Sequence, residues 1–181
     1  MLSMFLARWL DRFEATFNYD ASYMRHVLRV SPPSLLKFSL GSQAADRKAA
    51  PMAALFAAGL VGTLSEDCGP CVQVGVDIAA AQGLDPAVIR AVIAGDLDGM
   101  GETASLAYRF AQASLARDMT ACDPLRDEIV RRWGDAALVA IGLTLTASRM
   151  YPTLKYALGY GKSCSRVQVG GETVAPLKRA A

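Results

Sequence analysis

The feature that most constrains this fold is a Cys-Gly-Pro-Cys segment at residues 68–71, which stands between two helical patterns. Before it, residues 46–64 are rich in alanine and cover several helical turns. After it, residues 71–78 alternate locally like a strand, but the chain continues into three alanines and reaches Gly83, a typical helix end. No strand pattern leads into the motif, and Asp67 stands where thioredoxins usually have tryptophan. The sequence therefore predicts a dithiol in an all-helical chain rather than a thioredoxin fold.

Helical signals follow one another along most of the chain. Aromatic residues recur at helical spacing from Phe5 to Phe17 and predict an amphipathic helix over residues 3–16, an N-terminal arm within residues 1–17. Three cap-and-proline pairs predict helix starts, at Ser31, Asp85 and Asp123. We expect the remaining helices at residues 21–29, 32–40, 86–94, 101–117, 124–133, 135–148 and, after a break at Met150-Tyr151-Pro152, up to about Leu158.

The predicted domain organisation is simple. Residues 1–162 are expected to form a single all-helical domain, of a size that one hydrophobic core can serve. Residues 163–181 look like a C-terminal tail, in which residues 167–169 are expected to pair as a short strand or to lie extended on a neighbouring part.

Composition limits the classes of partner. Of 181 residues, 52% are hydrophobic, and the mean hydropathy of +0.24 is high for a soluble monomer, so we expect a homo-oligomer. The 19 basic and 17 acidic residues form no basic run with interleaved aromatic residues, which argues against nucleic-acid binding. The longest uncharged stretch, residues 49–65, falls short of the ~20 apolar residues that span a bilayer, so we expect no membrane insertion.

The N-terminus predicts the compartment. It lacks a basic segment and a small-residue cleavage site, so it does not read as a signal peptide, and we expect a cytoplasmic protein. In a reducing compartment, a Cys-x-x-Cys pair is usually catalytic or metal-binding.

The spacing of the two cysteines favours redox chemistry. With Cys68 at a helix N-terminus, free backbone N–H groups and the helix dipole favour its thiolate, and Cys71 lies one turn on, within disulfide reach. Two carboxylates precede Cys68 and oppose thiolate formation unless a cation compensates them. Glu66 is the candidate base, with a solvated loop carboxylate as the equal alternative, whereas Asp67 is interpreted as an N-cap-region carboxylate.

A metal site is not expected. Zinc would need about two further ligands, and the candidates Cys122, Cys164 and the single histidine, His26, have unsuitable spacings. We therefore expect no metal and no cofactor. We interpret Cys122 and Cys164 as isolated thiols and His26 as a structural residue.

The chain resembles the alkylhydroperoxidase D-like, carboxymuconolactone decarboxylase-like superfamily. The resemblance rests on the Cys68-x-x-Cys71 pair between two helices, with weaker support from residues 13–30 and 133–138, and it covers about residues 13–160. It implies an all-α multi-helix bundle with a helix–CxxC–helix core, homo-oligomers, and dithiol peroxidase or disulfide reductase activity. Active members have an upstream glutamate and a histidine four residues after the second cysteine. Here Gly75 occupies the histidine position.

The glutamate positions of the family also differ. They correspond to Phe56 and Leu64, twelve and four residues before Cys68, so Glu66 is the nearest acid. The proton relay of the family is therefore missing or displaced.

Two functions of different class follow from these observations. The first is a thiol–disulfide oxidoreductase that uses Cys68 and Cys71, with Glu66 assisting proton transfer. It would act on a peroxide or a partner disulfide, and a thiol reductant protein would restore the dithiol. By analogy with thioredoxins, the attacking thiolate would be Cys68, at the helix start. The family resemblance implies Cys71 instead, and we slightly favour Cys68. The second is a non-catalytic helical oligomer whose dithiol is vestigial or redox-sensing.

Overall fold

The computed structural model describes residues 1–161 and 167–175. Within them, nine helices and two short strands follow in chain order, so the chain is mostly helical as predicted. The elements are α1 (Leu2–Phe17), α2 (Ser22–Val30), α3 (Pro32–Gly41), α4 (Met52–Ser65), α5 (Gly69–Ala81), α6 (Pro86–Ala94), α7 (Gly101–Ala116), α8 (Met119–Trp133), α9 (Asp135–Ala157), β1 (Val167–Val169) and β2 (Glu172–Val174).

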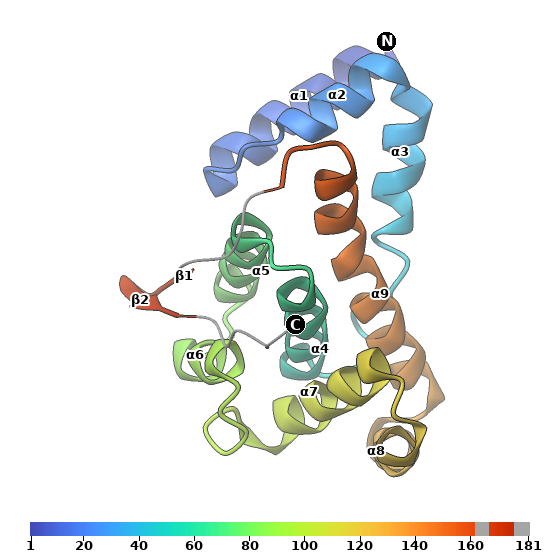
Figure 1. The fold of residues 1–181 in the computed structure, drawn as a ribbon, viewed down its shortest axis with the longest axis vertical. Helices are drawn as coiled ribbons and strands as arrows, with labels where there is room; N and C mark the ends of the chain where they lie inside the picture. Colours follow the sequence, from blue (N-terminus) through green and yellow to red (C-terminus); the bar gives the residue numbers. More distant parts are fainter. Residues whose placement is uncertain (162–166, 176–181) are drawn as a thin grey trace.

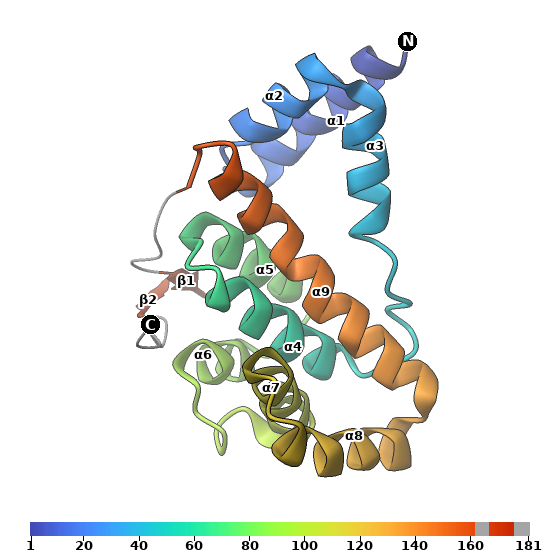
Figure 2. The ribbon, with the colours of Figure 1, turned by 45° about the vertical axis from the view of Figure 1, so that its right-hand side comes forward.

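Helix α4 is the centre of the bundle. It packs chiefly against α7 on one side and against the long helix α9 on the other (Figures 1 and 2). Helices α6, α7 and α8 lie at one end of the molecule, and α1, α2 and α3 lie at the opposite end, beyond α5 (Figure 1). Residues 66–68 connect α4 to α5, so the Cys-x-x-Cys segment forms the N-cap and first turn of α5, directly after the central helix.

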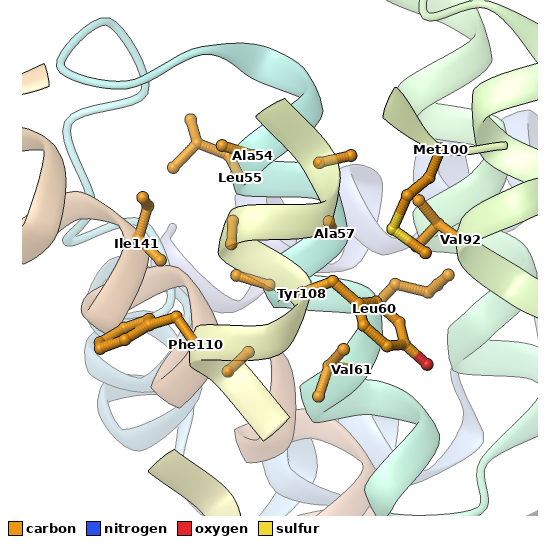
Figure 3. Close-up of a cluster of buried hydrophobic side chains, with 14 of the residues drawn as sticks. Ala54, Leu55, Ala57, Leu60, Val61, Val92, Met100, Tyr108, Phe110 and Ile141 are labelled. Carbon is orange, nitrogen blue, oxygen red and sulfur yellow. The ribbon is translucent and has the colours of Figure 1, made fainter. Parts of the chain in front are cut away.

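The larger hydrophobic core surrounds α4. Figure 3 shows small and branched side chains of α4 between those of α6, α7 and α9. Small residues allow close contact on the α9 side, because a Cβ on Gly62 would meet Ser148 Oγ and lie 2.9 Å from the Leu145 carbonyl oxygen. The alanine and glycine content of this segment therefore has a packing reason, namely the short distance between α4 and α9.

A second core forms at the N-terminal end. Its buried members come from α1, the following turn, α2 and α3: Leu6, Leu10, Tyr19, Ala21, Tyr23, Met24 and Leu35. Val74 of α5 and Leu154 of α9 pack against this cluster. The aromatic stripe predicted on the first helix contributes here, with Phe13 and Phe17 ring centroids 5.0 Å apart. Tyr19, in the turn after α1, therefore lies beside the part of α5 that carries the dithiol.

The predicted cap residues are confirmed in part. Ser31 and Asp85 are N-caps followed by proline, and the Asp85 carboxylate accepts a hydrogen bond from the Ala87 N–H. The predicted start at Asp123 is wrong: α8 begins at Met119, and its N-cap, Asp118, accepts from the Ala121 N–H. Competition between two nearby aspartates explains this difference, because the earlier one already satisfies a first-turn donor.

Two other predicted helix limits differ from the structure. The segment before Pro51 is a turn, in which Asp46 accepts from the Lys48 N–H, so α4 begins only at Met52. Helix α9 continues through Pro152 without the predicted break. Pro152 is buried, so packing keeps the helix intact although one backbone hydrogen bond is lost.

The described part of the tail forms a hairpin. Strand β1 pairs antiparallel with β2, with Gln168 opposite Thr173, which confirms the predicted short strand. The hairpin lies on α5, because the Gln73 side chain both donates to the Gln168 carbonyl oxygen and accepts from its N–H, at 3.1 and 2.8 Å. Val167 and Val169 are buried in the larger core. Cys164 lies outside the described residues.

Candidate dithiol site

The two cysteines lie at the start of α5. Cys68 is the N-cap, with extended backbone angles of φ −107° and ψ 92°, and Pro70 lies in the first turn. The Cα atoms of Cys68 and Cys71 are 5.4 Å apart, and their sulfurs are at disulfide distance. The predicted placement at a helix N-terminus is therefore found, and the two Cα atoms have the separation that a disulfide requires.

The two sulfurs differ in access. Cys68 is fully buried, whereas Cys71 is partly exposed and lines a cavity of about 510 Å³. Gly75, one turn after Cys71, also lines this cavity, and a Cβ at that position would meet no atom within 4 Å. The absence of a side chain at residue 75 therefore leaves open space beside the Cys71 sulfur.

The cavity lies between the N-terminal helices and the central bundle. Side chains from α1, α2, the loop before α4, and helices α4, α5 and α9 line it. Aromatic and aliphatic groups predominate: Trp9, Phe13, Tyr19, Tyr23, Met24, Met52, Leu55, Phe56, Leu60, Val74, Ile78 and Tyr151. Its volume and apolar lining are typical of a small-molecule site.

A buried polar cluster adjoins Cys71. The Tyr19 hydroxyl lies 3.6 Å from Cys71 Sγ, and either atom can donate. The same hydroxyl lies 3.4 Å from that of Tyr23 and accepts a hydrogen bond from Lys155 Nζ at 3.4 Å. Lys155 is only 1% exposed, and its Nζ lies 4.7 Å from the centroid of the Tyr19 ring. Tyr19 thus connects the more exposed thiol to a buried amino group.

Burial determines the protonation of the tyrosines. It raises the pKa of Tyr19 above its usual value, against the opposing effect of the Tyr23 hydrogen bond. Burial also raises the pKa of Tyr23. Tyr19 therefore stays a neutral phenol near pH 7. Its single proton is donated to the Tyr23 hydroxyl in this structure, and it has to turn to the Cys71 sulfur when that sulfur is a thiolate. A donor to the thiolate and a nearby lysine both favour the charged, reactive form of the thiol.

Glu66 faces α9. Its carboxylate accepts hydrogen bonds from Arg149 Nε at 2.6 Å and from the Thr153 hydroxyl at 3.1 Å. Within the described part of the chain, no hydrogen bond joins Glu66 to either cysteine. Arg149 is the cation that offsets the charge of this carboxylate next to the dithiol.

The turn after Glu66 is also hydrogen-bonded to α9. Asp67 has a positive φ of 48°, and its carbonyl oxygen accepts from the Tyr156 hydroxyl at 2.9 Å. Asp67 is not the N-cap of α5; Cys68 itself takes that position. Three residues of α9 therefore hold the segment before Cys68: Arg149 and Thr153 bind the Glu66 carboxylate, and Tyr156 binds the Asp67 carbonyl oxygen.

The other candidate residues lie elsewhere. His26 Nδ1 is 3.3 Å from the Tyr160 hydroxyl, in agreement with a structural role. Cys122 is a buried, free thiol on α8, 3.4 Å from the Ser114 hydroxyl. Among residues 1–161 and 167–175, no three metal-ligating side chains come together, and no helix has the length and apolar character needed to cross a membrane.

Sequence reasoning missed Tyr19 and Lys155. They are 136 residues apart. Tyr19 lies in the segment 13–30 that gave weaker support to the family resemblance, but nothing there indicated a role at the dithiol, and Lys155 belongs to no recognisable motif. The sequence signal was indirect: the family that the chain resembles has a histidine where Gly75 stands, so the resemblance left the dithiol without an obvious partner.

Comparisons with protein-family models, with curated proteins and with solved structures find no match to this chain.

Proposed function

We propose that this protein is a thiol–disulfide oxidoreductase that reduces a hydroperoxide at Cys71. One observation carries the proposal: the more exposed sulfur of the dithiol lines an apolar cavity and lies 3.6 Å from a neutral tyrosine that accepts a hydrogen bond from a buried lysine. This arrangement supplies a nucleophile, a proton route and a space for substrate. Burial favours Cys71 over Cys68 as the attacking thiol, contrary to the slight preference from the sequence.

The first step transfers one oxygen atom. The Cys71 thiol loses its proton to solvent, and the thiolate, which accepts a hydrogen bond from the Tyr19 hydroxyl, attacks the terminal oxygen of the hydroperoxide. The O–O bond breaks and an S–O bond forms. The alkoxide leaves as an alcohol after it takes a proton from the Lys155 ammonium group through the Tyr19 hydroxyl, and Lys155 then regains a proton from solvent. Cys71 is then a sulfenic acid.

The second step closes the disulfide. The Cys68 thiol attacks the Cys71 sulfur, the S–S bond forms, and the oxygen leaves as water. In sum, two thiols and a hydroperoxide give a disulfide, an alcohol and water, with two electrons transferred to the substrate. A thiol reductant protein reopens the disulfide by exchange, which a reducing cytoplasm would support.

The proposal includes the bundle type suggested by the sequence. In an alkylhydroperoxidase D-like bundle, the residue at position 75 would be the relay histidine, and here Gly75 leaves that space open. Tyr19 and Lys155 supply a donor and an amino group on another side of the same thiol. The relay is thus proposed to be replaced rather than lost.

We also propose a homo-oligomer. Several large apolar side chains are well exposed, among them Phe5 at 68%, Val30 at 71% and Val139 at 59%. Contact between copies would remove such groups from water.

Chemical trapping tests the function. In Cys68→Ser, one equivalent of cumene hydroperoxide should leave a sulfenic acid at Cys71 that dimedone captures and peptide mass spectrometry locates. Cys71→Ser should consume no hydroperoxide, and Cys122→Ser should turn over like the wild type with dithiothreitol. If both Cys68→Ser and Cys71→Ser consume hydroperoxide at the rate of the wild type, the dithiol is not catalytic and the redox-sensing or vestigial alternative replaces the proposal.

A further inference from the structure

The cavity beside Cys71 is elongated. On α4, its lining residues run from Met52 to Thr63, and on α5 and its C-cap they run from Cys71 to Gln82. Each run covers eleven helical steps, roughly 16 Å at 1.5 Å per residue. The short connection between the helices places the end of α4 beside the start of α5, so Cys71 lies at one end of the cavity.

The wall near the dithiol is apolar and aromatic. Phe13, Tyr19 and Val74 line the cavity together with Cys71. The buried lysine does not present its charge to this space, because Lys155 is 1% exposed and lies against the rings of Tyr19 and Tyr23. A ligand lying along the helices would therefore meet the thiol with an uncharged part.

The charge in the cavity lining is positive only. Among the described residues, Arg47 is the only charged side chain in the lining, and no aspartate or glutamate lines the cavity. Arg47 is exposed, on the loop that leads into α4, and the described part of the chain gives it no hydrogen-bond or ion-pair partner. An arginine at the rim of an apolar cavity is suited to bind a carboxylate through two parallel hydrogen bonds.

We infer that the cavity binds an amphiphilic monoanion, namely a carboxylate with a medium-length aliphatic body. The carboxylate binds Arg47, the body lies along α4 and α5, and its far end reaches Cys71. This inference deepens the proposed function, on which it rests for the redox step: the substrate class becomes a hydroperoxide carried on an aliphatic carboxylate. Binding itself requires only the cavity and Arg47.

Calorimetry on the double variant Cys68→Ser/Cys71→Ser isolates binding from redox chemistry. The probes are decanoate, decanamide, which has the same tail without the charge, and acetate, which has the charge without the tail. Decanoate should bind with one site per chain, decanamide about three- to tenfold more weakly, and acetate not measurably. Arg47→Ala should reduce decanoate affinity to that of decanamide and leave decanamide unchanged.

Two further variants locate the site. Lys48→Ala removes a neighbouring exposed cation and should leave decanoate affinity unchanged. Gly75→Leu places a side chain in the open space beside Cys71 and should weaken both decanoate and decanamide. Circular dichroism and thermal unfolding check that each variant is folded.

Three results would overturn the inference. Equal affinity for decanoate and decanamide in the wild type would exclude anion recognition, and unchanged decanoate binding in Arg47→Ala would exclude Arg47. Absence of binding, for example because a second copy of the chain fills the cavity, would exclude the ligand class. Decanoate binding as expected without hydroperoxide turnover would retain the site and overturn the proposed function instead.

Discussion

The sulfur of Cys71 and the hydroxyl oxygen of Tyr19 lie 3.6 Å apart, although 52 residues separate them in the chain. Tyr19 follows α1, and the second hydrophobic core holds it against α5. Lys155 of α9 donates to the same hydroxyl. The reactivity of the dithiol should therefore depend on the N-terminal helices and on α9, and not only on its own helix.

Removing the Tyr19 hydroxyl should raise the pKa of the Cys71 thiol. A hydrogen bond to the thiolate favours the charged form, so Tyr19→Phe loses that preference. Hydroperoxide turnover should fall by about 10²-fold or more, the usual contribution of a positioned proton donor. The pH dependence of iodoacetamide alkylation, in a Cys68→Ser background, measures the thiol pKa. Tyr151→Phe is the control, because the Tyr151 hydroxyl lines the same cavity but bonds to Ser42. An unchanged alkylation profile in Tyr19→Phe would contradict the role of Tyr19.

Replacing Lys155 by methionine should slow Cys71 alkylation at neutral pH. Methionine has a similar length but no amino group, so Tyr19 loses its donor and the site loses a group that can hold a proton. We expect the alkylation profile of Cys71 to move to higher pH in Lys155→Met. Lys37→Met makes the same change at an exposed position of α3 and should leave the profile unchanged. A purely structural lysine would alter the melting temperature without moving the alkylation profile.

The fold was predictable from the sequence where local signals act alone. The proline after Ser31 and the cap at Asp85 mark helix starts that the structure confirms. Local signals gave a wrong helix end where tertiary packing determines the structure. Pro152 predicts a break, but it is buried inside α9 and the helix continues through it. Two aspartates near the start of α8 compete as caps, and local rules do not rank Asp118 above Asp123.

The site was predictable only as far as the motif itself. The position of Cys68 at a helix N-terminus follows from the local sequence. The contact of Cys71 with Tyr19 does not, because it depends on how the N-terminal helices fold back onto α5. The hydrogen bond from Arg149 to Glu66 also joins residues that are distant in the sequence. The sequence therefore indicated Glu66 as a base for the dithiol, whereas in the structure its carboxylate binds Arg149.

Placing a histidine at position 75 should increase the reactivity of the dithiol. Gly75→His places an imidazole one turn after Cys71, where a Cβ meets no atom within 4 Å. A nearby base favours the thiolate, so alkylation of Cys71 should shift to lower pH and turnover should rise. Gly142→His is the matched control, since its Cβ also meets no atom within 4 Å but residue 142 lies on α9 and outside the cavity lining. Equal effects of the two substitutions would show that the open space beside Cys71 has no bearing on thiol chemistry.

Glu66→Gln should affect stability more than thiol chemistry. It weakens the charge-assisted bond from Arg149 Nε, a contribution of about 1 kcal/mol for a half-buried pair. The pKa of the cysteines should stay the same or fall, because a negative charge leaves the vicinity of Cys68. Urea unfolding and the alkylation profile measure the two effects separately. Asp67→Asn is the control: it removes the adjacent carboxylate and should not weaken the hydrogen bond between Glu66 and Arg149. A clear rise of the thiol pKa in Glu66→Gln would instead support Glu66 as the proton acceptor predicted from the sequence.

The ion pair between Glu14 of α1 and Arg25 of α2 should make the stability of the N-terminal helices pH-dependent. The hydrogen bond from Arg25 lowers the pKa of Glu14, and the Ala21 N–H also donates to Glu14 Oε1 at 3.0 Å. Because the folded-state pKa is below the ordinary value of 4.5, this stabilisation is complete above that pH and is lost as the pH falls through the lowered value.

Glu14→Gln keeps an acceptor for Ala21 but loses the charge, so at pH 7 it should destabilise the protein by about 0.5–1 kcal/mol. The difference between wild type and variant should shrink as the pH falls below about 4.5 and vanish in stronger acid, measured as melting temperatures at a series of pH values. Glu102→Gln is the control, because that side chain is 87% exposed in its pair with Arg132 and should change the melting temperature little at any pH. A Glu14→Gln effect that stays constant from neutral to acidic pH would mean that the charge of Glu14 does not stabilise the N-terminal helices that hold Tyr19 against the dithiol.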